Sequence, residues 1–204
     1  MPRAYDLGRR AAPKAETRAR IVRATLGILL DAGSAGVSNL AVAKAADVAP
    51  ATVRNHFPER SDLMLAAFEV LLDDLHVPDA SIFDGVTDPR TRIERLAHAL
   101  AGLYVRGEPW WQALEREPDL IQAWGGGVDR YYADVERLMR LALDDLGSDE
   151  RSVAVVASVI GPPTFFALRG RGLSSEDSVA LTLELALPWL EQRRSRLRTP
   201  GASP

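Results

Sequence analysis

The sequence contains no cysteine, which excludes disulfides, cysteine–zinc sites and thiol catalysis. Its longest apolar run, residues 153–160, is too short to span a bilayer. The N-terminus has no apolar stretch behind its first charges, so we expect no secretory signal. A chain without cysteine is compatible with a reducing compartment. We therefore expect a soluble cytoplasmic protein with no membrane partner.

Signatures of catalysis are also scarce. The three histidines, His56, His76 and His98, are isolated in the sequence and lack the spacing of metal ligands. There is no glycine-rich phosphate loop, and the carboxylates are spread along the faces of expected helices. We predict no catalytic residues, no cofactor and no metal site, and therefore a protein that is not an enzyme.

Charge is unevenly divided along the chain. Residues 1–60 carry ten Lys/Arg and five Asp/Glu, a net charge of +5, whereas residues 61–204 carry fifteen and twenty-three, a net charge of −8. A basic end on an acidic body indicates that this end meets a polyanion, although chance asymmetry is the alternative.

Helical periodicity dominates, and no stretch alternates long enough to predict a strand. The spacing predicts a first amphipathic helix over residues 16–32, ended by Gly33. Residues 1–14 are basic, contain two prolines and show no period, which predicts a flexible arm. The arm either enters a minor groove or serves only as a solubilising tail.

Three further helices are expected before residue 76. Ser38 caps a short helix that ends near Ala46, and Pro50 opens another that ends near Phe57. Ser61 is expected to cap a fourth helix that ends near Leu75.

The remainder of the chain is expected to form a linker and five more helices. The linker is predicted at residues 76–89 because it holds two prolines, a glycine and several aspartates. The expected helices cover residues 90–105, 109–116, 119–145, 149–169 and 176–195. Glycines 125–127 and the Gly161–Pro162–Pro163 run should interrupt the third and fourth of them.

The two short helices before residue 58 form a candidate helix-turn-helix. Asp47 lies in their turn, where a left-handed backbone is required. The helical spacing buries Val53 and Phe57 and turns Ala51 and Asn55 outward, with Thr52 and Arg54 beside them. Arg54 can bind guanine or a phosphate and Asn55 can read adenine. An ordinary solvated face is the alternative.

The stretch from Ala15 to Leu72 resembles the N-terminal domain of TetR-family regulators. The matching segments are Arg18-Ala19-Arg20-Ile21, Gly33 with Gly36, Ala43-Lys44-Ala45-Ala46-Asp47-Val48, and Thr52-Val53-Arg54-Asn55-His56-Phe57-Pro58 with Arg60. The resemblance implies an all-α, TetR-like fold of about nine helices. It implies an arm (1–14), a helix-turn-helix DNA-binding domain (15–75) and an effector-binding and dimerisation domain (76–204).

The resemblance also implies the DNA contacts. These are Ser38, Lys44, Pro50, Ala51, Thr52, Arg54, Asn55, His56 and Arg60, with Lys44 and Arg60 on phosphates. His56 either touches a phosphate or only caps its helix. The chain departs from the family at Arg54, where an aromatic is usual, at Ala49, where a Ser or Thr cap is usual, and at Asp47, where glycine is usual.

Bulky aromatic residues gather in the second half of the chain, where the resemblance implies a pocket for a small hydrophobic or aromatic effector. We predict that several of them line this pocket, although a core position is the alternative for any single one. They are Tyr104, Trp110, Trp111, Trp124, Tyr131, Tyr132, Phe165 and Phe166.

The last two expected helices indicate a homodimer. The final one has apolar residues on more than one face, including Leu183 and Leu187, as a helix packed against a partner does. The resemblance implies a dimer through these helices that binds a pseudo-palindromic double-stranded operator. The predicted function is a transcriptional repressor that a small effector releases from DNA. The alternative is a helical carrier or sensor without specific DNA binding.

Overall fold

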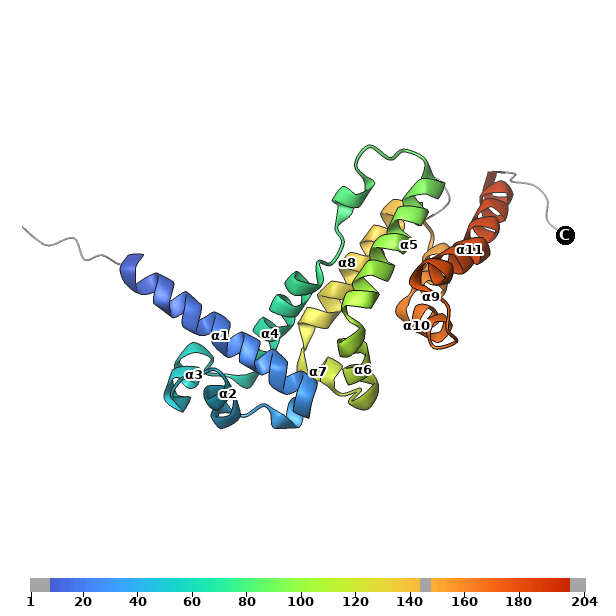
Figure 1. Cartoon of the computed structure of the whole chain (residues 1–204). Helices are drawn as coiled ribbons and strands as arrows, with labels where there is room; N and C mark the ends of the chain where they lie inside the picture. The colour runs from blue at the N-terminus through green and yellow to red at the C-terminus, as the bar shows by residue number, and fades with distance from the viewer. Residues whose placement is uncertain (1–7, 144–147, 199–204) are drawn as a thin grey trace, which may run out of the picture. The chain divides into compact units, whose positions relative to one another are not determined.

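The structure, a computed structural model, describes residues 8–143 and 148–198. Within these ranges the chain forms eleven α-helices and two 3-10 turns and contains no strand (Figure 1). The all-α prediction is therefore confirmed. The structure has two more helices than expected because the breaks near Gly125 and at Gly161 each divide one predicted helix into two.

The chain divides into two compact units. Unit 1 comprises residues 1–74 and 109–129, and unit 2 comprises residues 75–108 and 130–204. The expected domains had one boundary near residue 75, whereas the structure packs residues 109–129 with the N-terminal part. The contacts that hold this segment join residues too far apart in sequence for periodicity to reveal them.

Unit 1 is built on a long first helix, with two short helices packed beside it (Figure 1). Ile21, Val42 and Val53 are fully buried and supply one apolar side chain from each of these three helices. The elements are α1 (Gly8–Ala32), η1 (Ser34–Gly36), α2 (Asn39–Ala45), α3 (Pro50–His56), α4 (Arg60–Leu75), α6 (Glu108–Arg116) from Pro109 onward, and α7 (Leu120–Ala123).

Two expectations about helix starts are wrong. The predicted arm extended to residue 14, but α1 begins at Gly8 and contains Pro13. Pro13 is the sixth residue of α1, a position at which proline removes one intrahelical hydrogen bond and crowds the carbonyl of the preceding turn. Residues 1–7, with Arg3, lie outside the described residues. The α4 helix begins at Arg60 and not after a Ser61 cap, because the Leu63 amide donates to the Glu59 carbonyl at 3.4 Å.

Unit 2 packs its last helix against three others. Contacts join α11 to α5, α9 and α10, and Leu100, Val156 and Leu190 are fully buried there. The elements are η2 (Ala80–Phe83), α5 (Pro89–Arg106), α8 (Gly126–Leu143) from Arg130 onward, α9 (Glu150–Ile160), α10 (Pro162–Arg169) and α11 (Ser175–Arg198).

The expected linker, residues 76–89, is not an open connection. It contains η2 and buries Phe83 and Val86. The Arg92 guanidinium donates to the Val86 carbonyl at 2.8 Å, and Arg95 donates to the Ile82 carbonyl at 3.2 Å. The sequence did not show this because two apolar side chains are too few to produce a period.

A second correction concerns α11. Leu183 and Leu187, which were expected to face a partner, are buried within unit 2 at 9 % and 4 % exposure. Leu185 is a large apolar side chain of α11 that is 60 % exposed. The apolar residues on several faces of α11 are explained in part by its central position in unit 2.

One segment is long and apolar enough to cross a membrane by composition alone. It is Glu150–Arg169, with a mean hydropathy of 1.4 over the scored window and 33 % of that window buried. In the structure the helix is interrupted within this segment at Gly161, where φ is −73° and ψ is 167°. A single segment of this kind is weak evidence for a membrane span.

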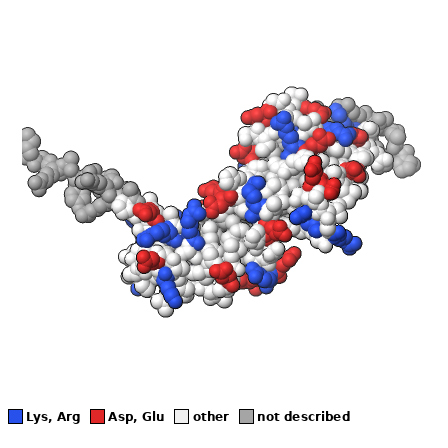
Figure 2. Space-filling view, in the orientation of Figure 1, with Lys and Arg blue, Asp and Glu red and all other residues white. Residues whose placement is uncertain are grey.

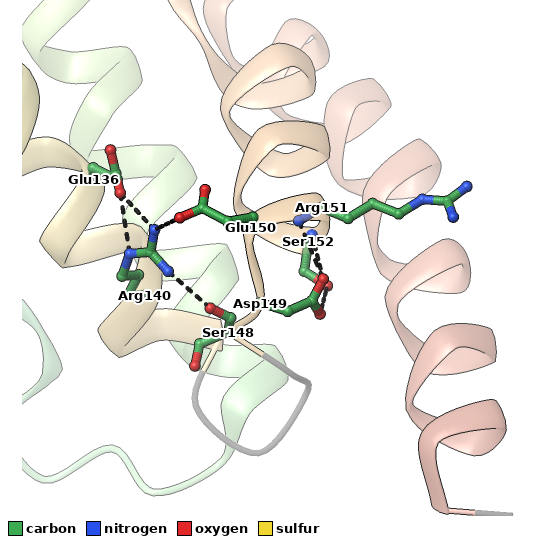
Figure 3. Close-up of polar contacts among 7 residues, drawn as sticks. All are labelled: Glu136, Arg140, Ser148, Asp149, Glu150, Arg151 and Ser152. Carbon is green, nitrogen blue, oxygen red and sulfur yellow. Dashed lines mark hydrogen bonds and ion pairs between the residues drawn. The ribbon is translucent and has the colours of Figure 1, made fainter. Parts of the chain in front are cut away.

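The start of α9 is held by a polar cluster on both of its sides. Asp149 caps α9 by accepting from the Arg151 amide at 3.1 Å and from the Ser152 hydroxyl at 2.8 Å (Figure 3). Arg193 of α11 also donates to Asp149 at 2.7 Å. On the other side, Arg140 of α8 bonds to Glu150 at 2.9 Å and to the Ser148 carbonyl at 3.0 Å (Figure 3).

We expect Asp149→Ala to lower the free energy of unfolding by about 1 to 2 kcal/mol at pH 7, the usual cost of losing an N-cap. Arg193 and Ser152 hold the pKa of Asp149 well below its ordinary value. The stabilisation is therefore present above the pKa of the unfolded chain and is lost as the pH falls through the folded pKa. Urea unfolding of Asp149→Ala, with the exposed Asp84→Ala as control, should show a deficit that shrinks in acid. Equal stability of both variants at pH 7 would contradict the assignment.

Candidate functional site

The turn between α2 and α3 has the backbone that a helix-turn-helix requires. Asp47 has a φ of 53°, in the left-handed region, as predicted. The Val48 amide then donates to the Ala43 carbonyl at 3.0 Å, which closes the end of α2. The α3 helix starts at Pro50, as expected, and Ala49 at its N-cap provides no side-chain hydrogen bond.

The outward face of α3 is set by two buried side chains. Val53 is 0 % and Phe57 3 % exposed, as predicted, whereas Ala51, Arg54 and Asn55 are exposed. Thr52 is half-buried at the edge of this face. The Arg18 guanidinium of α1 lies 4.6 Å from the centre of the Phe57 ring, a cation–π contact at the end of α3. The resulting outward surface is small, polar and positive.

The α2 helix presents two more of the expected contacts. The Ser38 hydroxyl accepts from the Ala41 amide at 3.1 Å, which confirms the predicted cap. Its own proton remains available to donate to a phosphate oxygen. Lys44 is exposed in the last turn of α2. The expected contacts therefore come from both helices of the motif.

His56 and Arg60 lie in different surroundings from the other expected contacts. His56 is half-buried at the end of α3, and its Nδ1 atom is buried without a hydrogen-bond partner among the described residues. Arg60 is exposed, but its guanidinium donates to the Ser34 carbonyl at 2.6 Å. A phosphate contact by Arg60 would have to compete with this intramolecular bond.

A carboxylate from residues 109–129 fastens the loop that leads into α2, within unit 1. The Ser34 amide donates to Glu117 Oε2 at 2.8 Å, and the Ser34 hydroxyl donates to Oε1. The Ser34 side chain and then its amide hold the pKa of Glu117 below its ordinary value. Arg116 donates to the Leu30 carbonyl near the end of α1 at 3.2 Å. We call this set of bonds the Ser34–Glu117 clasp.

Gly33 makes room for the clasp. Its φ of 69° is in the left-handed region, and a Cβ at this position would collide with the Glu117 carboxylate. The stop of α1 at Gly33 was expected from the sequence. Its close approach to Glu117 was not, because 83 positions separate Ser34 from Glu117 and no local signal links them.

The eight predicted pocket aromatics fall into two clusters. In unit 1, the Trp124 ring lies 4.9 Å from Phe68 and 5.9 Å from Trp110, centre to centre. Trp124 is 3 % exposed, and its Nε1 donor has no partner among the described residues. Trp111 is in the same unit and half-buried. The sequence did not indicate that Phe68 of α4 joins this cluster, because Phe68 lies on an apolar helix stripe like any core residue.

The second aromatic cluster lies in unit 2. Tyr104 is 5.5 Å from Phe165 and 6.3 Å from Phe166, again between ring centres. Burial, with smaller effects of Tyr131 and Tyr132, raises the pKa of Tyr104, and burial raises that of Tyr131 to about 12. Tyr132 is 50 % exposed. The structure thus groups the predicted residues by unit.

A hollow of about 490 Å³ lies elsewhere on unit 2. Its lining consists of Ile82, Thr91, Glu94, Arg95, His98, Ala99 and Leu183. None of the predicted aromatics takes part in it. Among the described residues, no three His, Asp or Glu side chains are grouped so that they could hold a metal ion.

The surface charge is mixed. On the face shown in Figure 2, acidic and basic side chains are interspersed over the described residues and form no uniform basic patch.

Comparison with solved structures identifies the fold. No family model matches the sequence, and no curated protein matches it. The multidrug binding protein EbrR complexed with imidazole is 23 % identical, with 91 % of this chain and 96 % of that chain covered and a TM-score of 0.57. The same protein with malachite green is 19 % identical, with 84 % and 96 % covered and a TM-score of 0.54.

A third similar structure is a transcriptional regulator from Saccharomonospora viridis in complex with choline. It is 19 % identical, with 83 % of this chain and 95 % of that chain covered and a TM-score of 0.52. The fold predicted from the sequence, TetR-like and all-α, is therefore confirmed. The similar structures are thus of a multidrug binding protein and of a transcriptional regulator.

We expect Glu117→Gln to loosen the loop around Ser34, because an amide offers one acceptor where the carboxylate offers two. The free energy of unfolding should fall by about 1 kcal/mol, a typical value for a hydrogen bond to a charged group that is partly lost. Hydrogen exchange at residues 33–37 should be faster than in the native protein. Glu115→Gln, an exposed neighbour, is the control, and equal exchange in both variants would show that the clasp does not hold the loop.

Proposed function

We propose that this chain is a ligand-responsive transcriptional regulator of the TetR family that binds DNA through α2 and α3. The observation that supports this most is the α2–Asp47–α3 geometry, with Val53 and Phe57 buried and Ala51, Arg54 and Asn55 turned outward. The shared fold with ligand-bound regulators adds to it.

Each outward residue has a role that follows from its chemistry. In this proposal α3 enters the major groove, where Arg54 binds guanine or a phosphate and Asn55 reads adenine. Ala51 and Thr52 are small enough to let the helix backbone approach the bases. Ser38 and Lys44 bind phosphates from α2, and Pro50 and His56 lie at the two ends of α3. Binding should weaken as the salt concentration rises, because Lys44 and Arg54 displace counterions from the phosphates. The Asp47 carboxylate repels phosphate and reduces this attraction.

We expect Arg54→Ala to weaken operator binding by about tenfold or more and Asn55→Ala by a similar factor, since a good bidentate base contact contributes about 1 to 3 kcal/mol. The measurement is a salt titration of binding to DNA from around the protein's own gene. Arg171→Ala, an exposed arginine of unit 2, serves as the control. Weak binding that neither substitution changes would point to the carrier or sensor that binds no specific DNA.

The effector in this proposal is a small organic molecule that contacts the aromatic clusters. The similar structures hold imidazole, malachite green and choline, which are small and mostly cationic or aromatic. We favour the cluster of Trp110, Trp124 and Phe68 as the effector contact that controls DNA binding. It belongs to the same unit as α2 and α3, and the segment carrying both tryptophans also carries Glu117. A ligand that shifts this segment strains the Ser34–Glu117 clasp and hence the start of α2.

Malachite green is a direct probe of this site. We expect it to quench tryptophan fluorescence and to release operator DNA, with Trp110→Ala weakening its binding about tenfold through loss of one aromatic contact. Trp189→Ala, in α11, is the control for loss of a tryptophan elsewhere. A ligand-saturated protein that still binds operator as tightly as the free protein would contradict effector-controlled release.

The finer features of the proposal concern assembly and outcome. A homodimer through the helices after residue 149 would present two α3 helices to a pseudo-palindromic operator, and exposed Leu185 of α11 is an apolar side chain available for it. In this proposal the protein is a repressor, because the effector releases it from the operator. It acts in the cytoplasm, where the DNA is.

A further inference from the structure

Leu40 is the most exposed large apolar side chain among the described residues. It is 71 % exposed and lies in the first turn of α2. A leucine in this position contributes little to the core of unit 1, since most of its surface remains in water. The apolar side chain of Leu40 is therefore available to contact a partner.

The residues around Leu40 decide what kind of partner it suits. At about 100° per residue, Leu40 and Lys44 lie on the same side of α2, away from the buried Val42. Its sequence neighbours Ser38 and Asn39 are polar and exposed. Leu40 is thus a single large apolar group on a polar, basic surface and not part of an apolar patch.

This environment argues against protein docking. A protein interface needs a contiguous area of roughly 800 Å² on each partner, with an apolar centre. One leucine beside a lysine and two polar residues does not provide it. A single leucine side chain matches a single apolar group in size. In the major groove, thymine is the base that presents such a group, its 5-methyl.

We propose that Leu40 contacts the 5-methyl group of a thymine in each operator half-site and selects for thymine at that position. The inference rests on the proposed DNA-binding function. Lys44, on the same side of α2, holds the nearby phosphate and brings Leu40 toward the groove. Leucine has no donor or acceptor, so it distinguishes thymine from the other bases by the methyl group alone.

The test removes the methyl group without changing base pairing. Each thymine of a half-site is replaced in turn by deoxyuridine, and the affinity of the native protein, Leu40→Ala and Leu141→Ala is measured for every probe. Leu141 is a 42 % exposed leucine of α8 and is the matched control. Because Leu40 is so exposed, Leu40→Ala should fold normally, which thermal unfolding monitors independently.

We expect one thymine position at which deoxyuridine weakens native binding about fourfold, the equivalent of one buried carbon group. Leu40→Ala should bind the unmodified operator about as weakly as the native protein binds the deoxyuridine probe. It should be insensitive to deoxyuridine at that position, while Leu141→Ala behaves like the native protein. If Leu40→Ala binds like the native protein, or keeps the full deoxyuridine effect, the inference is wrong while operator binding sensitive to Arg54→Ala stands. If the native protein shows no saturable operator binding, the proposed function fails and the inference with it.

Discussion

Burial of Val53 and Phe57 is the constraint on which the outward face of α3 depends. A helix of seven residues such as α3 is not stable in water by itself, so packing must provide its stability. Each of these side chains contributes roughly 1.5 to 3 kcal/mol when buried. Because both leave α3 on the same side, Ala51 and Asn55 lie on the opposite side, and Arg54 is exposed beside them. The direction of each proposed base contact thus follows from two apolar residues that never touch DNA.

The loop before α2 has a comparable dependence on a distant part of the chain. Ser34 uses its amide and its hydroxyl to bind Glu117, and its carbonyl accepts from Arg60. All of its polar groups are engaged, so the loop has little freedom while these bonds persist. Residues 109–129 belong to unit 1 because of such contacts together with the packing of Trp124 on Phe68. A segment that looks like part of an effector domain is therefore bonded to the chain that precedes the helix-turn-helix.

The sequence predicted what local rules decide and missed what distant contacts decide. The Ser38 cap, the left-handed Asp47, Pro50 at the start of α3 and the buried Val53 all follow from residue type and helical spacing, and the structure confirms them. The Ser34–Glu117 clasp and the division of the aromatics between two units were not predictable, because they join residues many positions apart. The burial of Leu183 and Leu187 was misjudged for the same reason, since periodicity shows that a face is apolar but not what covers it.

The size of the clasp suits a switch. Coupling between two ligands is usually about 1 to 3 kcal/mol, and a hydrogen bond to a charged group contributes about 1.5 to 3 kcal/mol. Weakening one or both Ser34 bonds to Glu117 would therefore give the free-energy change that the proposed effector control requires, without any rearrangement of the α2–α3 packing. A clasp made of many more bonds would hold the loop in one state with or without effector. A small, partly buried polar contact can respond to a small molecule where a closely packed core cannot.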